Sequence, residues 1–473
     1  MYYKLRRDVL FRNYKEYGLI TDISEYGYRM LNDTRPVLGE EFVSQSGAVM
    51  LSMIGRKPIS INEIVNNLSK IFIGVDIQTL EDDTKEFLGY FCDKGYLCYG
   101  DKEEDCQEQL FKDLKEAPAD NTFVPIVDDC GKNIIKSKDF LRSIHVEIAN
   151  VCNERCVHCY IPHKDKINAI DSNLFYRIIE EGRDMNIIHV TLSGGEPLLH
   201  KDIIGFLKRC RELDLSVNVL SNLTLLTDEI LEEMVKNPLL SVQTSIYSLN
   251  SLVHDQITQL SGSLEKTLNG LKRVLDAGIP AQISCPVLKQ NKDDFSEVIE
   301  WGRKNSTSVA IEPVIFASYD HTGENLANRL NLDEIGKAID CQLNEGYVDI
   351  LKGIAREKES IKPDDPACSI CRYSFCVSAI GTVYPCVGWT TNIVGDLNTE
   401  SLYEVWNNSK KIDELRNIKK RDFPECVDCK DRGYCNVCMM SNSNENPDGD
   451  AFRINKFHCK VAELKHKKLS IYK

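Results

Sequence analysis

Apolar and polar positions follow one repeating rhythm through the middle of the chain. From Ile144 onward, short apolar runs of strand length alternate with segments whose apolar residues recur every three or four positions, the spacing of an amphipathic helix. Parallel strands need such crossover segments, so the alternation predicts a parallel α/β sheet. Six units predict a partial (β/α)6 barrel over residues 141–320, short of the eight units of a closed barrel. Strands are expected at 145–149, 189–193, 216–221, 241–246, 281–287 and 308–315, with helices at 174–185, 202–213, 228–236, 264–277 and 293–304.

The first part of the chain has a different order of elements. Ser60 and Glu63 form a capping-box pattern that opens a helix at 61–71, and a second helix at 77–93 has one apolar face. Short strands are expected at 9–11, 19–21, 40–43 and 96–99, with a further helix at 48–54. This order of elements predicts a winged-helix-like domain over residues 1–100.

Two stretches connect the predicted domains. Residues 101–140 read as a linker, because a charged run at 101–105 and several prolines interrupt any regular pattern; a short helix is expected at 107–114. Residues 321–367 form a bridging region. The remaining residues, 368–473, form a cysteine-rich domain of their own.

Composition and charge exclude several classes of function. The chain carries 58 basic and 72 acidic residues, a formal charge of -14. Affinity for nucleic acid comes largely from basic side chains, and the helix at 61–71 has Lys70 as its only basic residue, so no nucleic-acid partner is expected. No apolar stretch approaches the ~18 residues of a membrane span, and no apolar segment follows the basic residues near the start. A cytoplasmic protein without a membrane partner is expected.

Nineteen cysteines are a high number for such a chain, and nine of them lie after position 367. In a reducing cytosol, cysteine clusters bind metal more often than they form disulfides. Three others, Cys152, Cys156 and Cys159, form a CxxxCxxC loop just after the first barrel strand. Three thiolates can hold three corners of a [4Fe–4S] cluster and leave one iron open to a ligand. A zinc loop completed by His158 or His163 is the alternative.

The second barrel strand ends in the turn Ser-Gly-Gly-Glu-Pro at 193–197, about 35 residues after the cysteine loop. Together the two elements resemble the signature of the radical S-adenosylmethionine enzymes. The resemblance implies that Cys152, Cys156 and Cys159 carry the catalytic cluster and that its open iron binds the amino and carboxylate groups of S-adenosyl-L-methionine. It further implies cofactor contacts from His158, Gly194, Gly195, Glu196, Pro197, Ser221, Asn222 and Ser245, with Tyr247 and Asn291 nearby. Glu312 is a further residue that could face the barrel interior.

The cysteine-rich tail resembles the SPASM domain, a seven-cysteine module that carries two auxiliary [4Fe–4S] clusters. The resemblance implies Cys368, Cys371, Cys386 and Cys438 as ligands of the first cluster, and Cys426, Cys429, Cys435 and Cys459 as ligands of the second. Two residues separate Cys435 from Cys438 where the family has three, and Cys371 and Cys376 exceed the seven. Cys376 lies in a strand-like run and is either a spare thiol or an exchange ligand. Zinc is again the alternative, because CxxC pairs also form zinc sites.

The N-terminal domain resembles the PqqD-like recognition domains that are fused to many peptide-modifying enzymes. In that family a leader peptide adds as an extra strand to the small sheet, a mode in which main-chain hydrogen bonds give affinity. The expected groove lies between the strand at 40–43 and the helix that begins near Ile77. The alternative is a domain that only packs against the barrel.

Together these resemblances imply a radical enzyme that modifies a ribosomally made precursor peptide, with a reductant such as flavodoxin or ferredoxin as a second partner. Intramolecular thioether formation is the leading prediction. Carbon–carbon crosslinking and epimerisation use the same parts, and sulfatase maturation by formylglycine formation would leave the front domain unexplained. A non-catalytic redox or regulatory protein would leave the Gly-Gly-Glu-Pro turn without a role.

Overall fold

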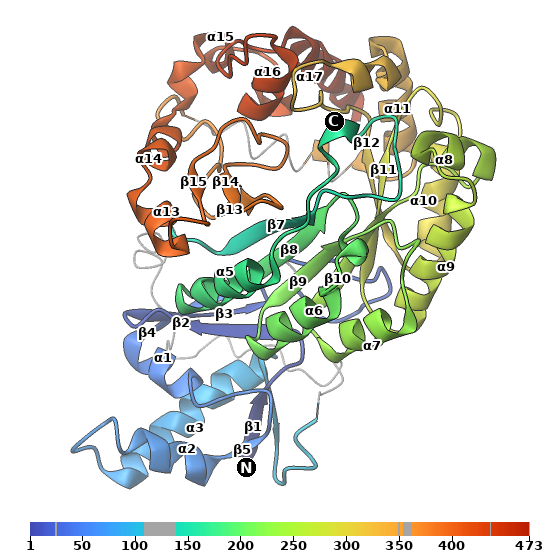
Figure 1. The fold of residues 1–473 in the computed structure, drawn as a ribbon. Helices are drawn as coiled ribbons and strands as arrows, with labels where there is room; N and C mark the ends of the chain where they lie inside the picture. Colours follow the sequence, from blue (N-terminus) through green and yellow to red (C-terminus); the bar gives the residue numbers. More distant parts are fainter. Residues whose placement is uncertain (24–25, 108–138, 349–350, 353–361, 436, 473) are drawn as a thin grey trace.

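A nine-stranded sheet runs through the centre of the molecule (Figure 1). In the computed structural model the strand order is β12-β11-β10-β9-β8-β7-β13-β14-β15. The six strands from β7 to β12 pair in parallel: β7 (Ser143–Ala149), β8 (His189–Gly194), β9 (Ser216–Leu220), β10 (Leu240–Ser245), β11 (Ala281–Pro286) and β12 (Ser308–Glu312). The structure describes residues 1–23, 26–107, 139–348, 351–352, 362–435 and 437–472.

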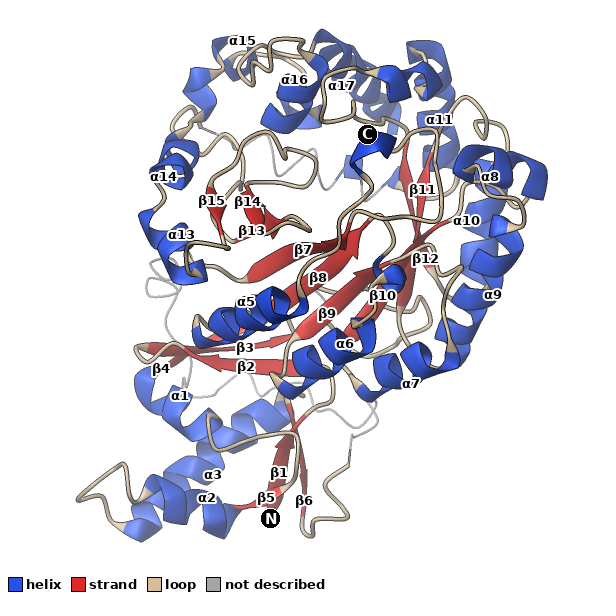
Figure 2. Ribbon diagram, in the orientation of Figure 1, coloured by secondary structure: helices blue, strands red, loops and turns tan. Residues whose placement is uncertain are grey.

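Helices cover the outer face of these parallel strands (Figure 2). The predicted ones are α5 (Ser172–Asp184), α6 (Ile203–Glu212), α7 (Asp228–Lys236), α9 (Ser263–Asp276) and α10 (Phe295–Lys304). The predicted partial barrel is therefore confirmed. The sequence pattern missed α8 (Ser251–Thr258), and its sixth strand was too long. That strand ends at Glu312 because Pro313, which follows, has no N–H to continue the ladder.

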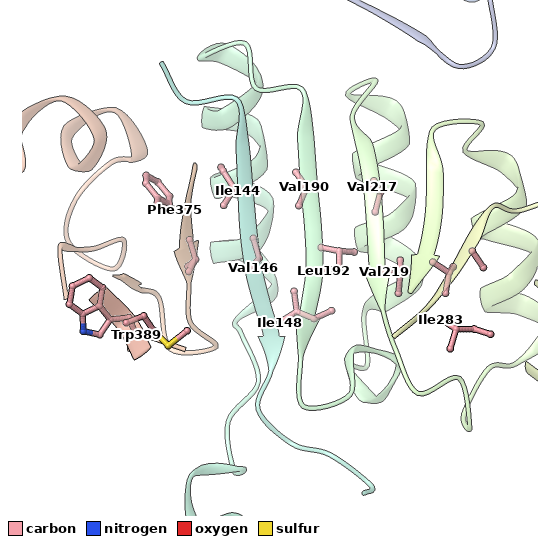
Figure 3. Close-up of a cluster of buried hydrophobic side chains, with 14 of the residues drawn as sticks. Ile144, Val146, Ile148, Val190, Leu192, Val217, Val219, Ile283, Phe375 and Trp389 are labelled. Atoms are coloured by element: carbon pink, nitrogen blue, oxygen red, sulfur yellow. The ribbon is translucent and has the colours of Figure 1, made fainter. Parts of the chain in front are cut away.

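The parallel strands have an apolar outer face and a polar inner face. The outward side chains belong to one buried cluster that includes Ile144, Val146, Ile148, Val190, Leu192, Val217 and Val219 (Figure 3). Successive side chains of a strand point to opposite faces, so His145 and Glu147 of β7 face the inside of the barrel. Bulky apolar residues normally fill a barrel interior. A polar interior leaves this one suited to a ligand.

The cysteine-rich tail continues the same sheet. Its first strand, β13 (Ser374–Val377), pairs in parallel with β7, and β14 (Thr382–Tyr384) and β15 (Gly395–Asp396) follow in antiparallel order. The helices of this region are α13 (Leu402–Asn408), α14 (Lys410–Asn417), α15 (Pro424–Val427), α16 (Met439–Glu445) and α17 (Lys456–Leu469). An ion pair of 2.5 Å from Lys468 of α17 to Asp340 joins the tail to α11 (Leu332–Asn344), in the bridging region. The tail is thus attached to both edges of the barrel.

The N-terminal domain contains two small antiparallel sheets and three helices. One sheet has the order β2 (Val9–Asn13), β3 (Tyr17–Asp22), β4 (Glu40–Ser44), and the other has the order β5 (Ile59–Ser60), β1 (Tyr2–Leu5), β6 (Leu97–Gly100). The helices are α1 (Gln45–Leu51), α2 (Ile61–Leu68) and α3 (Ile77–Asp93). The sequence pattern missed β1 and β5, and it carried α2 to Ile71 where the helix ends at Leu68. The Ser60 side chain accepts a hydrogen bond from the Glu63 N–H, as predicted for the start of α2.

The sheet β2-β3-β4 lies between the N-terminal helices and the barrel. Leu19 and Phe42 on one of its faces pack with Ile188 and Leu239, which precede barrel strands β8 and β10. The other face carries residues such as Val43, which pack with the N-terminal helices. The domain therefore sits against the amino-terminal ends of the barrel strands. The cysteine loop lies at the opposite, carboxyl-terminal ends.

The predicted helix at 107–114 lies almost wholly outside the described residues. Among the helices that the structure does describe, none is both long enough and apolar enough to cross a lipid bilayer.

Candidate active site

The three cysteines of the CxxxCxxC loop lie close together at the carboxyl end of β7. The Cys156 thiol donates a 3.2 Å hydrogen bond to Glu154 Oε2, and the Glu154 N–H donates to Cys152 Sγ at 3.4 Å. Burial raises the pKa of Cys156 well above its ordinary value, and the neighbouring Glu154, Cys159 and Cys152 raise it further. Burial also raises the pKa of Cys152 to about 11. Only a bound metal centre would make such thiols into thiolates near neutral pH.

The turn after β8 packs closely against this loop, and two glycines in the turn make the contact possible. Gly195 N donates to Ala149 O at 2.6 Å, and Glu196 N donates to Val151 O at 2.9 Å. Gly194 has a φ of 128°, and a Cβ at that position would overlap the carbonyl oxygen of Ala149. A Cβ at Gly195 would overlap the next two carbonyl oxygens of the cysteine loop. Only glycine permits this approach of the two backbones.

Glu196 joins the ends of two barrel strands. Its carboxylate accepts hydrogen bonds from Ser221 Oγ at 2.7 Å, Asn222 N at 2.8 Å and Leu198 N at 2.9 Å. Burial raises its pKa to about 7, while these three bonds lower it. Pro197 begins the short 3-10 helix Pro197–Leu199 and is buried. Glu196 and Ser221 therefore hold the turn in place, with their polar atoms already engaged.

Several buried polar atoms around the strand ends have no hydrogen-bond partner within the described protein. They are Asn150 Oδ1, Glu154 Oε1 and His158 Nδ1. Buried polar groups are normally paired, so a group of unpaired ones indicates a ligand with polar atoms of its own. The cofactor expected from the sequence carries amino, carboxylate, ribose and adenine groups, so these residues fit it. Sequence reasoning had missed Asn150 and Glu154, although both lie in the loop that follows the first barrel strand.

His158 lies beside Tyr247, with their rings edge to face at 5.1 Å and Tyr247 Oη 3.5 Å from His158 Nε2. Burial lowers the pKa of His158 to about 4, and Lys166 lowers it further. The ring is therefore neutral near pH 7, and its unpaired Nδ1 can meet a polar ligand. Ser245 ends β10, two residues before Tyr247. A neutral imidazole in this position suits a neighbouring purine better than a cation would.

Asn222 and Asn291 differ in what they offer a ligand. Asn222 Nδ2 donates to Asn153 Oδ1 at 2.9 Å and ties β9 to the cysteine loop. Asn291 is fully buried: its Nδ2 donates to the carbonyls of Tyr247 and Pro286, and its Oδ1 accepts from Leu288 N. The Asn291 amide is occupied by backbone, so it supports the pocket wall.

A second group of cysteines lies where the tail meets the barrel. The thiols of Cys386 and Cys438 each interact with Cys368, and Cys371 interacts with both Cys386 and Cys368. Burial raises the pKa of Cys371 and Cys386 to about 12. Cys376 lies on β13, as its strand-like run predicts, and its thiol interacts with Cys386, Glu147 and Cys371. The four expected ligands therefore lie near one another, with a fifth thiol beside them.

The third group of cysteines surrounds a cavity of about 260 Å³. Cys426, Cys429, Cys435 and Cys459 all line it. Tetrahedral zinc would hold its sulfurs about 4 Å apart. Within the described part of the chain, no three His, Cys, Asp or Glu side chains converge closely enough to hold a single ion. A cavity with cysteines on its walls suits a larger group such as a four-iron cluster.

Comparison with known proteins agrees with both cysteine patterns. Residues 146–302 match the model of the Radical SAM superfamily, and residues 368–430 match that of an iron-sulfur cluster-binding domain, SPASM. The AdoMet-dependent heme synthase of Methanosarcina barkeri is 26% identical over 320 residues, covering 63% of this chain and 88% of that protein. The PqqA peptide cyclase of Bradyrhizobium diazoefficiens is 23% identical over 306 residues, covering 61% and 79%.

A solved structure resembles almost the whole chain. It is Streptococcus suis SuiB bound to its precursor peptide SuiA, with a TM-score of 0.61 at 16% identity, and the match covers 96% of this chain and 99% of that one. The likeness therefore includes the N-terminal domain as well as the barrel and the tail. It establishes a shared fold.

Proposed function

We propose that this chain, a radical S-adenosylmethionine protein with a C-terminal SPASM domain, modifies a ribosomally made precursor peptide by closing an intramolecular thioether crosslink. The observation that carries the proposal is the likeness over 96% of the chain to a protein solved with its precursor peptide. A similar barrel alone would not point to a peptide, because the relatives include a heme synthase.

Cys152, Cys156 and Cys159 would hold the radical-generating cluster, and Gly194 and Gly195 allow the turn after β8 to lie against the loop that carries these cysteines. Bound there, the cluster and S-adenosyl-L-methionine supply a 5′-deoxyadenosyl radical that removes a hydrogen atom from carbon. The protein would orient the cofactor through the unpaired atoms of Asn150 and His158. It also keeps water from the reacting atoms.

The two further cysteine groups would hold auxiliary clusters. We assign Cys368, Cys371, Cys386 and Cys438 to the first and Cys426, Cys429, Cys435 and Cys459 to the second. Closing a thioether releases one electron from the peptide, and an auxiliary cluster is suited to accept it. A carbon–carbon crosslink would use the clusters in the same way.

The N-terminal domain supplies a site for the leader part of the peptide. Strand β4 pairs with β3 on one side, and among the described strands it has no partner on the other. Val43 of β4 and Phe87 of α3 both crowd around Gly47 of α1, so the strand and the helix lie next to each other. A strand at the edge of its sheet and beside a helix is suited to β-augmentation by an extended peptide. A reductant such as flavodoxin or ferredoxin completes the proposed system.

Carbon–carbon crosslinking is the second candidate, because one relative is named a peptide cyclase. The test uses the holoprotein with reconstituted iron, dithionite, S-adenosyl-L-methionine and the small peptide encoded beside the gene. A thioether predicts the loss of two hydrogen atoms and of one alkylatable cysteine thiol per bond. Loss of two hydrogen atoms with every thiol still alkylatable would support the carbon–carbon bond. An unchanged mass with solvent deuterium in the peptide would support epimerisation.

A further inference from the structure

A buried carboxyl group lies inside the barrel where nothing assigned so far requires one. Glu147 on β7 has 3% of its surface exposed. Its neighbours Val146 and Ile148 face the outer helices (Figure 3), so the Glu147 side chain points inward. Glu147 is two residues before Ala149, whose carbonyl oxygen accepts a hydrogen bond from Gly195 N. Glu147 also pairs with Ser193, the residue before the two glycines of the turn, so it lies on the strand just before the turn's contact with β7.

The neighbours of Glu147 are weakly bound phenols and a thiol. Tyr160 Oη lies 3.5 Å from Glu147 Oε1, a long distance for a hydrogen bond. The Tyr384 hydroxyl lies beside the same carboxyl and has no hydrogen bond of good geometry. The other groups that interact with it are Tyr319 and Cys376. Each of these neighbours is neutral when protonated and negative when it loses its proton. None of them is therefore a cation that could pair with the carboxylate.

Glu196 shows what a carboxylate with a structural role looks like in this barrel. It accepts three hydrogen bonds of 2.7 to 2.9 Å from its own surroundings. Glu147 has no such set of donors, although burying an unsatisfied charge is costly. Burial raises the pKa of Glu147 to about 7, and Tyr384 and Tyr160 oppose the shift. The carboxyl can therefore gain or lose a proton near neutral pH.

The position of this group joins two of the cysteine sets. Tyr160 directly follows Cys159 of the radical-generating loop, and Tyr384 lies two residues before Cys386 of the second set. Strand β13, which carries Cys376, pairs with β7 and brings these segments together. Glu147 thus lies between the place where hydrogen is removed and the place where an electron would be accepted.

We propose that Glu147 accepts the proton released when the crosslink closes, with the Tyr160 hydroxyl as the relay that reaches the peptide. The inference rests on the proposed function. A thioether joins a carbon and a sulfur that each lose one hydrogen. The first leaves as a hydrogen atom with the 5′-deoxyadenosyl radical; the second leaves the thiol as a proton while one electron passes to an oxidised iron–sulfur centre. The carbon–sulfur bond forms, the S–H bond breaks, and the proton ends on the Glu147 carboxylate.

Glu312 is the competing carboxyl. It ends β12 on the far side of the barrel and accepts a 3.3 Å hydrogen bond from Val314 N. Burial raises its pKa, whereas Lys465 and His458 of α17 lower it, so basic side chains are its neighbours and not the phenols and the thiol that surround Glu147. Glu312→Gln is therefore the matched control for Glu147→Gln.

The test compares the wild-type holoenzyme with Glu147→Gln, Tyr160→Phe and Glu312→Gln, using the peptide encoded beside the gene. Glu147→Gln and Tyr160→Phe are expected to slow crosslink formation about 100-fold, the usual scale of general base catalysis. Formation of 5′-deoxyadenosine without peptide should stay within about twofold of wild type, because it precedes the proton step. The wild-type rate should rise with pH through about 7, and the rise should be absent in Glu147→Gln.

A second measurement does not depend on the peptide. The infrared difference spectrum of wild type minus Glu147→Gln should contain a protonated carboxyl band at pH 6 that is lost by pH 8. Iron content and circular dichroism establish that each variant folds. If Glu147→Gln does not fold, Tyr160→Phe still tests the relay, because that variant retains the Glu147 carboxyl.

Two kinds of failure are distinguishable. If the wild type forms no crosslink, the proposed function fails and this inference fails with it. If the wild type forms crosslinks and Glu147→Gln retains both the rate and the pH profile, the inference alone is overturned. It is equally overturned if the infrared band is absent at pH 6, or if the pH dependence disappears in Glu312→Gln instead.

Discussion

At the scale of single residues, the strictest constraint lies where the Gly194–Gly195 backbone meets the cysteine loop. A side chain at either position would occupy the space of a carbonyl oxygen from the 149–151 segment. Gly194 also has a φ of 128°, which L-residues rarely adopt. The turn and the loop therefore act as one unit, and a change in one displaces the other.

Gly194→Ala should weaken binding of S-adenosyl-L-methionine at least tenfold and destabilise the fold by about 1–3 kcal/mol, because the added Cβ meets Ala149 O in a strained backbone. Titration calorimetry and thermal unfolding of the reconstituted protein measure the two effects. Gly278→Ala is the matched control: its φ is also positive, 75°, but a Cβ there meets nothing within 4 Å. Equal cofactor affinity in the two variants would contradict the role given to the turn.

The cysteine assignments in the tail predict a difference between two neighbouring thiols. Cys371→Ala should reduce iron from about twelve to about eight atoms per chain, because it removes a ligand of the first auxiliary cluster. Cys376→Ala should retain about twelve, because that thiol is outside the assigned set. Iron analysis with electron paramagnetic resonance of the reduced protein measures both. The opposite pattern would make Cys376 the ligand and Cys371 the spare thiol.

Site residues that are close together in sequence could be predicted from it. Site residues that only the fold brings together could not. The CxxxCxxC loop and the turn at 193–197 are contiguous motifs, so their chemistry is visible in the sequence. Tyr384 meets Glu147 only because β14 pairs with β13 and β13 pairs with β7 across more than two hundred residues, which no local pattern reveals. Asn291 was expected near the cofactor, yet its amide is consumed by backbone groups that the sequence does not identify.

At the scale of elements, the barrel strands were predicted well because each has a strongly apolar outer face. The strands of the N-terminal domain are short, and β5 has only two residues, so periodicity carries little signal there. Helix α8 was missed because it has only eight residues, which follow the short connection 246–250 and show no clear apolar repeat. The seating of the β2-β3-β4 sheet on the barrel depends on tertiary contacts such as Phe42 with Ile188, and these are invisible in sequence.

The buried ion pair between Arg142 and Glu40 joins β4 to the start of the barrel. Arg142 Nη1 lies 2.6 Å from Glu40 Oε1, with side chains 13% and 8% exposed. Arg142→Ala should lower the free energy of unfolding by about 3–5 kcal/mol, because it leaves Glu40 buried and without its cation. Arg209→Ala, which breaks an exposed pair with Glu180, should change it by less than about 1 kcal/mol. Urea unfolding compares the two, and equal losses would contradict a special role for the domain contact.

At the scale of the whole molecule, the three parts are arranged around one sheet. The N-terminal domain packs at the amino-terminal ends of the barrel strands, whereas the cysteine loop lies at their carboxyl ends. The tail extends the same sheet past β7 and places Cys376 beside Glu147 of the barrel interior. A peptide held by its leader at β4 must therefore extend along the barrel to reach the reactive centre.

Binding of the precursor peptide should slow amide hydrogen exchange in β4 and at the start of α3, because the leader would add as a strand to that edge. Hydrogen exchange with mass spectrometry, with and without the peptide encoded beside the gene, measures the protection. A peptide that lacks the leader half serves as the control and should protect only the barrel. Protection absent from residues 40–44 with the full peptide would make this domain a packing module.

The most direct test of the central claim is a deuterium-transfer measurement. The precursor peptide is labelled with deuterium at the carbon that mass spectrometry locates in the crosslink, and it is turned over by the reconstituted protein with dithionite and S-adenosyl-L-methionine. The account predicts deuterium in the 5′-deoxyadenosine in proportion to the crosslinks formed, and neither product from the Cys152, Cys156 and Cys159 triple alanine variant. A crosslink that forms while the 5′-deoxyadenosine remains free of deuterium would contradict it.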